Sequence, residues 1–219
     1  MQTPSAVLFD FGNTLFAHAS LARTIELGAR RCGAAVSFAT ALELARRIDR
    51  AAHAPEELAL GRDLDAAVWS SSWQRLYAVA DEVAAGVGDE VYRLMHDPAE
   101  WMPFEATKDT LRRLRGHGVR VGVLSNTGWD IRVVFDHLGL AGFIDTFVLS
   151  CEIGAVKPKA EAFVLACEQL GVEPSGVLMV GDDVVADIGA CGVGLRTLLL
   201  PPAAAGSDNG IGLVAKLLT

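Results

Sequence analysis

The sequence predicts an α/β fold in which a doubly wound parallel sheet carries an all-helical insertion. Short apolar runs, each about as long as one strand, alternate with helical patterns through most of the chain. One long segment, residues 18–101, contains helical patterns alone. Polar residues directly follow three of the apolar runs, and ligands bind at such strand ends in open parallel sheets.

Five apolar runs are the candidate strands: residues 6–9, 119–124, 147–149, 177–180 and 197–200. They are apolar at nearly every position, as expected of strands that are buried on both faces of a parallel sheet. Helical patterns between and after them cover residues 107–116, 129–138 and 159–170, and another begins at residue 185. Glycines at or just beyond the ends of the first three provide stop signals. This alternation predicts a Rossmann-like sheet.

The insertion follows the first strand directly. Its helical patterns cover residues 20–32, 38–53, 64–80 and 87–96, and Ser37 and Asp63 are the predicted N-caps. We therefore expect two domains. Residues 1–17 and 102–219 form an α/β core, and residues 18–101 form the inserted helical domain.

Composition narrows the range of partners and locations. The 219 residues are 51% hydrophobic and 21% charged, which is an ordinary globular mixture. The formal net charge is −8 without a basic block, so we expect no nucleic-acid partner. The N-terminus lacks a secretory leader pattern and the apolar runs are too short to span a bilayer. We expect a cytoplasmic protein with no membrane partner and with four buried free cysteines; its oligomeric state stays open.

Chemistry-bearing residues gather at the predicted strand ends: Asp10, Ser125 with Asn126, and Asp182 with Asp183. Because the carboxyl ends of parallel strands meet at one edge of a sheet, these residues should converge, with Lys157 nearby. Several carboxylates crowded together repel one another unless a cation offsets them. Carboxylate and carbonyl oxygens are ligands that suit Mg²⁺. One carboxylate could then act as a nucleophile while the metal and Lys157 stabilise a transferring phosphoryl group.

Four segments resemble the motifs of the haloacid dehalogenase-like superfamily. Residues 10–15, Asp-Phe-Gly-Asn-Thr-Leu, resemble its motif I, and Leu124-Ser125-Asn126 is similar to motif II. Val156-Lys157-Pro158 is similar to motif III, and residues 181–187, followed by Gly189-Ala190, resemble motif IV. The four segments occur in the family's order and span almost the whole chain.

The resemblance implies a Mg²⁺-dependent phosphatase that acts on a small phosphorylated metabolite. Asp10 would form a phospho-aspartyl intermediate, which water then hydrolyses. Mg²⁺ would be held by the Asp10 carboxylate, the Gly12 carbonyl and the Asp182 carboxylate, with Asp187 in or just outside the metal shell and Asp183 a weaker candidate. Ser125, Asn126 and Lys157 would bind the phosphate. The helical insertion matches the family's mobile cap, which closes over the site and selects substrates.

One position departs from the family pattern. Its phosphatases usually carry a second Asp two positions after the nucleophile, where it protonates the leaving group, but this chain has Gly12. General acid–base help is typically worth about 10²–10⁴-fold in rate. A substitute acid could come from His18, from the cap or from the substrate, and a leaving group of low pKa would need less help.

Two alternative functions remain open. A 2-haloacid dehalogenase would use the same Asp to attack carbon without a metal, although that branch usually has Tyr where Gly12 stands. A protein that binds a phosphorylated ligand or a partner protein without turnover is the other alternative. His18 is interpreted as a surface residue. Trp69, Trp73 and Tyr77 recur at helical spacing, so they are interpreted as packing between helices rather than as a substrate wall.

Overall fold

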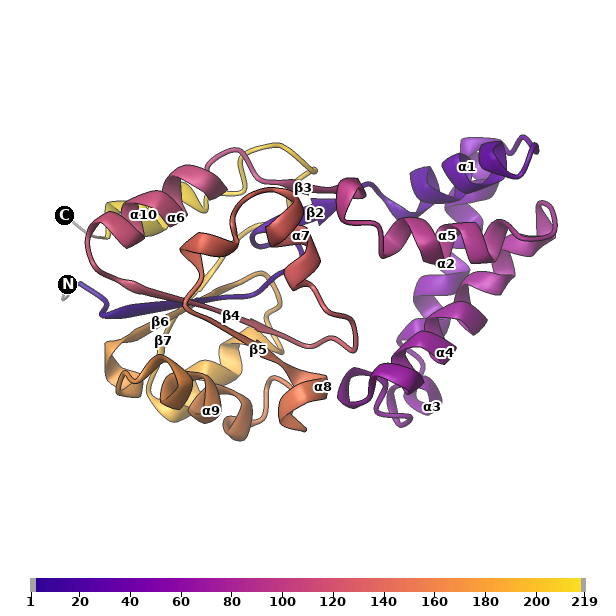
Figure 1. The fold of residues 1–219 in the computed structure, drawn as a ribbon. Coiled ribbons are helices and arrows are strands. Elements are labelled where there is room, and N and C mark those ends of the chain that lie inside the picture. Colours follow the sequence, from indigo (N-terminus) through magenta and orange to yellow (C-terminus); the bar gives the residue numbers. More distant parts are fainter. Residues whose placement is uncertain (1–2, 218–219) are drawn as a thin grey trace.

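The computed structural model describes residues 3–217 and contains a five-stranded parallel sheet with helices on both faces (Figure 1). The strand order is β5-β4-β1-β6-β7, and every neighbouring pair is parallel. The strands are β1 (Ala6–Phe9), β4 (Arg120–Ser125), β5 (Thr146–Leu149), β6 (Val177–Gly181) and β7 (Arg196–Leu199). The predicted doubly wound α/β fold is confirmed. Because β1 lies in the middle, the residue after it lies at the crevice where ligands bind in such sheets.

Alternating residues of β1 enter two separate hydrophobic cores. Val7 and Phe9 pack on one face of the sheet, and Ala6 and Leu8 pack on the other. The first face is covered by α6 (Thr107–Gly116), α7 (Arg132–His137) and α10 (Gly212–Lys216), and the second by α9 (Ala160–Leu170) (Figure 1). Because both faces are buried, the strand reads as a continuous apolar run.

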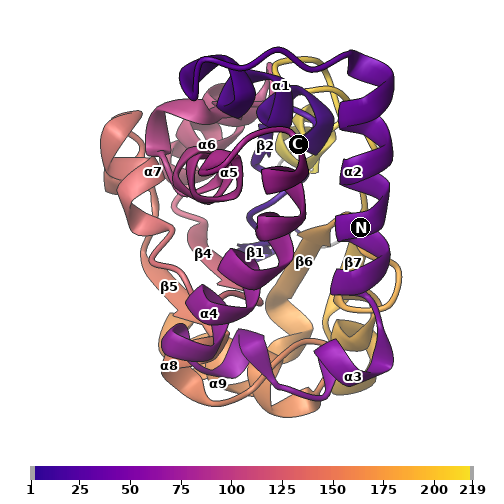
Figure 2. The ribbon, with the colours of Figure 1, turned by 90° about the vertical axis from the view of Figure 1, so that its right-hand side faces the viewer.

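Five further helices form a separate group within residues 18–101, which we call the helical segment. They are α1 (Leu21–Arg31), α2 (Phe38–Ala52), α3 (Pro55–Leu58), α4 (Ala66–Tyr77) and α5 (Val87–Met95). Their buried apolar residues form a third core that includes Ile25, Ile48 and Val91. Figure 2 shows these helices in front of the strands, so the segment lies over one end of the sheet.

A short antiparallel ladder joins the two ends of the helical segment to the rest of the chain. Strand β2 (Phe16–His18) pairs with β3 (Trp101–Pro103). The sequence does not predict these strands, because three residues are too few to show a period of two. The ladder brings the start and the end of the helical segment side by side.

Short elements account for the other differences from expectation. The structure adds α8 (Ser150–Ile153) and the 3₁₀ turns η1 (Arg62–Leu64), η2 (Ala78–Glu82), η3 (Pro98–Glu100), η4 (Ala141–Phe143) and η5 (Pro174–Gly176). The helix expected from residue 185 is the 3₁₀ helix η6 (Asp187–Val193). The helix α8 and the turns η1 to η5 have three to five residues each, which is too short to produce a helical pattern in the sequence.

The two predicted N-caps have different outcomes. Ser37 caps α2 as expected, since its hydroxyl accepts a hydrogen bond from the Thr40 N–H at 3.1 Å. The prediction for Asp63 is wrong, because Asp63 lies inside the turn η1. Asp65 is extended and its carboxylate accepts hydrogen bonds from the N–H groups of Ala67 and Val68. Extended backbone and a side-chain acceptor together define an N-cap.

The cysteines are less buried than the sequence analysis expects. All four cysteines are free, and Cys167 is buried as expected. Cys32 and Cys191 are exposed, so the expectation of burial is wrong for them.

Within residues 3–217, no helix combines the length and the apolar character that a membrane span needs.

The close approach of α5 to the end of α4 gives a first prediction. A β-carbon on Gly88 would lie 2.7 Å from the Tyr77 carbonyl oxygen and 2.8 Å from the Ala78 Cα. Both are backbone atoms that cannot rotate away, so we expect Gly88→Ala to lower the free energy of unfolding by about 1–3 kcal/mol. Urea denaturation measures this change. Gly116→Ala is the control, because a β-carbon there meets nothing within 4 Å; equal stability of the two variants would contradict the prediction.

Candidate active site

A cavity of about 420 Å³ lies between the sheet and the helical segment. Its floor comes from residues that follow the strands: Asp10 after β1, Ser125 at the end of β4 and Asp182 after β6. Gly12, Asn126 and Lys157 also line it. The structure therefore brings together the residues that the sequence places at separate strand ends, as the crossover topology requires.

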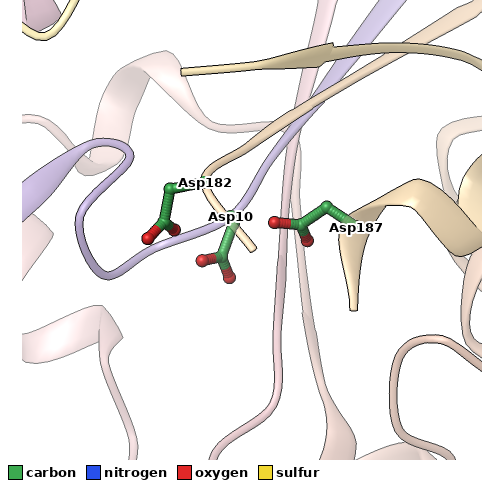
Figure 3. A group of neighbouring side chains, drawn as sticks. All are labelled: Asp10, Asp182 and Asp187. Atoms are coloured by element: carbon green, nitrogen blue, oxygen red, sulfur yellow. The ribbon is translucent and has the colours of Figure 1, made fainter. Parts of the chain in front are cut away.

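Three carboxylates come together here, and two of them, Asp10 and Asp182, line the cavity. Asp10, Asp182 and Asp187 each offer an oxygen, and these oxygens all lie within 4.8 Å of one another (Figure 3). Asp187 is fully buried in η6, whereas Asp10 and Asp182 are partly exposed. Asp183 stabilises the following turn instead, because its Oδ1 accepts hydrogen bonds from the Val185 and Ala186 N–H groups at 2.7 and 3.0 Å.

A buried ammonium group connects two of these carboxylates. Lys157 Nζ lies 2.7 Å from Asp10 Oδ1 and 2.7 Å from Asp187 Oδ1, and its side chain is 3% exposed. Burial by itself lowers the pKa of Lys157, but the attraction of Asp10 and Asp187 outweighs it, so the net pKa is raised. Lys157 is therefore charged at neutral pH and acts as a fixed cation beside Asp10.

Negative charge remains in excess around this lysine. The pKa of Asp10 is raised to about 6: burial raises it most, the contact with Lys157 lowers it, and the charges of Asp187 and Asp182 raise it. The pKa of Asp182 is also raised, first by burial and then by Asp187. Three carboxylates facing one ammonium are a cation site by charge and by ligand type, because Mg²⁺ prefers oxygen ligands. The residues present therefore fit the Mg²⁺ that the sequence predicts.

Asn126 holds the loop that carries Lys157. Its Nδ2 donates to the Lys157 carbonyl at 2.9 Å, and its Oδ1 accepts from the Lys157 N–H at 2.8 Å. The sequence placed Asn126 on the phosphate, but the structure turns its amide towards this loop backbone. Ser125 is nearly buried and lines the cavity.

The loop after β1 is fixed from two sides. Thr14 Oγ1 lies 3.3 Å from Asp182 Oδ1, and Asn209 Nδ2 donates to the carbonyl oxygens of Asn13 and Thr14 at 3.3 and 2.9 Å. Asn209 is buried and was missed by the sequence analysis, because an Asn before Gly reads as a turn residue. A β-carbon on Gly12 would meet nothing within 4 Å, so space for a side chain is available near Asp10.

Aromatic rings form part of the cavity lining, which we call the aromatic wall. Trp69, Trp73 and Tyr77 of α4 line it together with Trp101 and Trp129. The interpretation of the α4 rings as packing between helices is confirmed for Tyr77 and Trp73, which lie in or against the third core. All three rings also border the cavity. Helical spacing places them on one face of α4, but the sequence does not show that part of this face borders a cavity.

Two contacts dock the helical segment on the sheet beside this wall. Ser150 Oγ donates to the carbonyl oxygen of Asp63 and accepts from the Thr127 N–H at 2.8 Å. Gly128 is in contact with Trp69, and a β-carbon on Gly128 would overlap the Trp69 side chain. The segment can approach the core closely at this point because Gly128 has no side chain.

His18 is the histidine that the sequence offered as a substitute acid, and the structure brings a second histidine, His96, to the cavity. His18 lies outside the cavity, and its ring nitrogens face the carbonyl oxygens of Ala19 and Leu94. His96 lines the cavity. Because an indole N–H can only donate, His96 Nε2 accepts from Trp69 Nε1 at 3.1 Å, and Nδ1 donates to the Tyr92 carbonyl at 2.7 Å. Burial lowers the pKa of His96, so the ring is neutral at neutral pH.

The neutral state of His96 predicts a pH-dependent stability. A histidine whose folded pKa lies below its unfolded value, about 6.5, contributes stability above pH 6.5 and loses it as the pH falls towards the folded pKa. We expect the stability difference between wild type and His96→Gln to shrink between pH 7.5 and pH 5, as measured by urea denaturation. His117→Gln is the control on the exposed surface; a difference that is flat with pH for His96→Gln would contradict the assignment.

The packing of Asp187 predicts how the metal site depends on Gly181. A β-carbon on Gly181 would overlap the Asp187 carboxylate, so Gly181→Ala should displace this group from Lys157 and the other carboxylates. We expect Mg²⁺ affinity, measured by titration calorimetry, to fall by about 10–100-fold. Gly192→Ala is the control. Gly192 lies in η6, the 3₁₀ helix that carries Asp187, and a β-carbon there meets nothing within 4 Å. Unchanged affinity in Gly181→Ala would refute the role given to Asp187.

Comparison with known proteins agrees with this geometry. A family model described as haloacid dehalogenase-like hydrolase matches residues 4–192. The chain is 30% identical over 213 residues to a ribulose-1,5-bisphosphate 5-phosphatase of Halopiger xanaduensis, covering 90% of this chain and 85% of that protein.

Solved structures show the same fold. The chain is similar to a HAD phosphatase from Thermococcus onnurineus, with a TM-score of 0.65, 22% identity and 97% of each chain covered. It is also similar to an L-2-haloacid dehalogenase from Xanthobacter autotrophicus, with a TM-score of 0.70, 16% identity and 98% of each chain covered. With the family model matched across most of its length, the chain belongs to the haloacid dehalogenase-like hydrolases and is an enzyme of that family.

Proposed function

We propose that this enzyme is a Mg²⁺-dependent phosphatase that hydrolyses a small phosphorylated metabolite through a phospho-aspartyl intermediate on Asp10. The observation that carries the proposal is the position of Asp10 at the cavity floor, in contact with Lys157 and within 4.8 Å of two further carboxylates. The similarity to a ribulose-1,5-bisphosphate 5-phosphatase supports phosphoryl transfer. A buried fixed cation beside a nucleophilic carboxylate is suited to the charge of a phosphoryl group.

The chain's own residues account for the two chemical steps. A carboxylate oxygen of Asp10 forms a bond to phosphorus as the bond from phosphorus to the leaving oxygen breaks. Water then attacks the phospho-aspartyl group, which releases inorganic phosphate and regenerates Asp10. Lys157 stays bonded to Asp187 while its charge stabilises the phosphoryl oxygens, and Ser125 donates a hydrogen bond to one of them.

A bound Mg²⁺ would be held by the carboxylates of Asp10 and Asp182 and by the Gly12 carbonyl, with Asp187 in or just outside the metal shell. When bound, it neutralises negative charge that the substrate brings to the site. The helical segment would act as the cap that closes the site against bulk water and selects the substrate. The boundaries proposed for it are residues 18–101, and the core comprises residues 1–17 and 102–219.

The Asp182 carboxylate favours a phosphatase over a dehalogenase. Attack on a carbon–halogen bond needs no metal, so a second carboxylate beside the nucleophile would only add repulsion. The excess of negative charge around Asp10 is useful where a divalent cation and an anionic substrate both bind. The alternative of binding without turnover rests on the missing side chain at Gly12.

The test is hydrolysis of p-nitrophenyl phosphate and acetyl phosphate with Mg²⁺. We expect Asp10→Asn to lower kcat/KM by at least about 10³-fold, because the amide cannot serve as the nucleophile. Asp136→Asn, on the exposed surface of α7, is the control and should match wild type. A chelator should abolish activity, and Mg²⁺ should restore it.

Three other results would contradict the proposal. Equal near-zero rates for wild type and Asp10→Asn would favour a binding protein. Chelator-resistant release of halide from a 2-haloacid would favour a dehalogenase. Full activity in Asp10→Asn would remove this residue from the mechanism.

A further inference from the structure

The aromatic wall of the cavity contains every tryptophan in the chain. The sequence has four, Trp69, Trp73, Trp101 and Trp129, and all of them line the cavity above Asp10. Two come from α4, one from β3 and one from the loop that follows β4. Residues from three separate stretches of chain therefore present ring surface to the same space.

These rings are held in place by contacts with one another and with their surroundings. Trp73 stacks on Tyr77, with 5.2 Å between ring centroids and 25° between planes. Trp101 is nearly parallel to Trp129 at 6.0 Å and 28°. The indole N–H of Trp69 is hydrogen-bonded to His96. A preorganised wall of this kind binds a flat ligand with little loss of side-chain entropy.

The charge of the cavity limits what a substrate can carry beside its phosphate. Among the lining residues that the structure describes, Lys157 is the one Lys or Arg side chain, and both of its carboxylate partners are in the catalytic group. The neutral His96 supplies no charge. A second phosphate or carboxylate on the substrate would therefore lose its hydration without gaining a cationic partner, at a cost in affinity.

The same cavity offers little help to a poor leaving group. Gly12 has no side chain to donate a proton, and both His96 nitrogens are occupied by Trp69 and Tyr92. A phenolic oxygen, with a pKa of about 10, leaves as its anion far more readily than the oxygen of an aliphatic alcohol. A phenol also brings a planar ring that can stack on an indole.

We propose that the substrates are aryl phosphates, monoesters whose phosphate is carried by a phenolic oxygen and whose ring stacks on the tryptophan wall. This inference rests on the proposed phosphatase function and narrows its substrate class. Asp10 takes the phosphoryl group, the bond between phosphorus and the phenolic oxygen breaks, and the phenolate takes a proton from water. A second water then releases inorganic phosphate from Asp10.

A cationic leaving group fits this wall less well than a neutral ring. Aromatic cages bind quaternary ammonium groups through the negative faces of their rings. Here the Arg62 guanidinium already lies 4.8 Å from the Trp73 ring centroid. The same guanidinium is 3.6 Å from the carboxylate of Asp63, the acidic residue of the helical segment that lines the cavity. Arg62 therefore already occupies the cation–π contact with Trp73 and the ion pair with Asp63 that a cationic leaving group would need.

The decisive experiment compares phenyl, benzyl and cyclohexyl phosphate with Mg²⁺, alongside acetyl phosphate and phosphocholine. Phenyl phosphate has the ring and the phenolic oxygen, benzyl phosphate has the ring alone, and cyclohexyl phosphate has neither. We expect KM for the two ring compounds to be about 5-fold below that of cyclohexyl phosphate, from stacking. We expect kcat for phenyl phosphate to exceed that for benzyl phosphate by about 10-fold or more, because no acid assists the alcohol.

Two variants assign these effects to residues. Trp73→Leu and, separately, Trp129→Leu should bring the KM ratio of cyclohexyl to phenyl phosphate towards one, with folding checked by thermal denaturation. Phe38→Leu, an exposed ring outside the cavity, is the control and should keep the wild-type ratio. Gly12→Asp, for which the space is open, should supply an acid and narrow the kcat gap between phenyl and benzyl phosphate.

The outcomes separate this inference from the function on which it rests. Turnover of acetyl phosphate with equal or better use of cyclohexyl phosphate or phosphocholine would overturn the aryl substrate class and leave the phosphatase intact. A KM ratio that persists in both tryptophan variants would also overturn it. No turnover of any of the five compounds would overturn the phosphatase function and this inference with it.

Discussion

The contact between the Lys157 ammonium and the carboxylates of Asp10 and Asp187 is the constraint on which the site depends. It joins the end of β1, the loop before α9 and the start of η6. A charge this deeply buried is stable only with its partners, and removal of one partner of a buried pair typically costs about 3–5 kcal/mol. The groups around it therefore have to hold both carboxylates within hydrogen-bond distance of the ammonium.

Several uncharged residues serve that positioning. Asn126 fixes the backbone on both sides of the Lys157 residue, and Asn209 fixes the loop that follows Asp10. Gly181 leaves the space that the Asp187 carboxylate occupies. None of these groups has to react, yet each decides where a reacting charge lies. A site of this kind is preorganised by hydrogen bonds and by close packing rather than by its charged groups alone.

Two parts of the chain line the cavity, and they contribute different kinds of side chain. The sheet supplies the carboxylates and the lysine, whereas the helical segment supplies most of a wall of rings with little charge. Contacts at Gly128 and at Ser150 hold the two parts together. Because Gly12 offers no acidic side chain beside Asp10, the proposed chemistry depends more on the substrate than it would in a site with its own proton donor.

Sequence patterns were sufficient where the physics is local or repeats along the chain. Five strands appear as apolar runs because both faces of the sheet are buried, and Asp10 and Asp182 were found because they follow such runs. Short elements escaped this reasoning. The ladder of β2 and β3 has three residues in each strand, and Asn209 reads as part of a turn, so neither leaves a periodic signal.

The sequence by itself determined the sheet, the helical character of the insertion and the residues that carry charge to one edge. The tertiary structure alone decided which atoms those residues meet. It placed the Asn126 amide on a loop backbone and made Asp65 rather than Asp63 the cap of α4. It also turned the rings of α4 towards a cavity. The reason is physical: side-chain type and spacing fix local conformation, but a hydrogen bond or a cavity wall depends on groups brought together from distant parts of the chain.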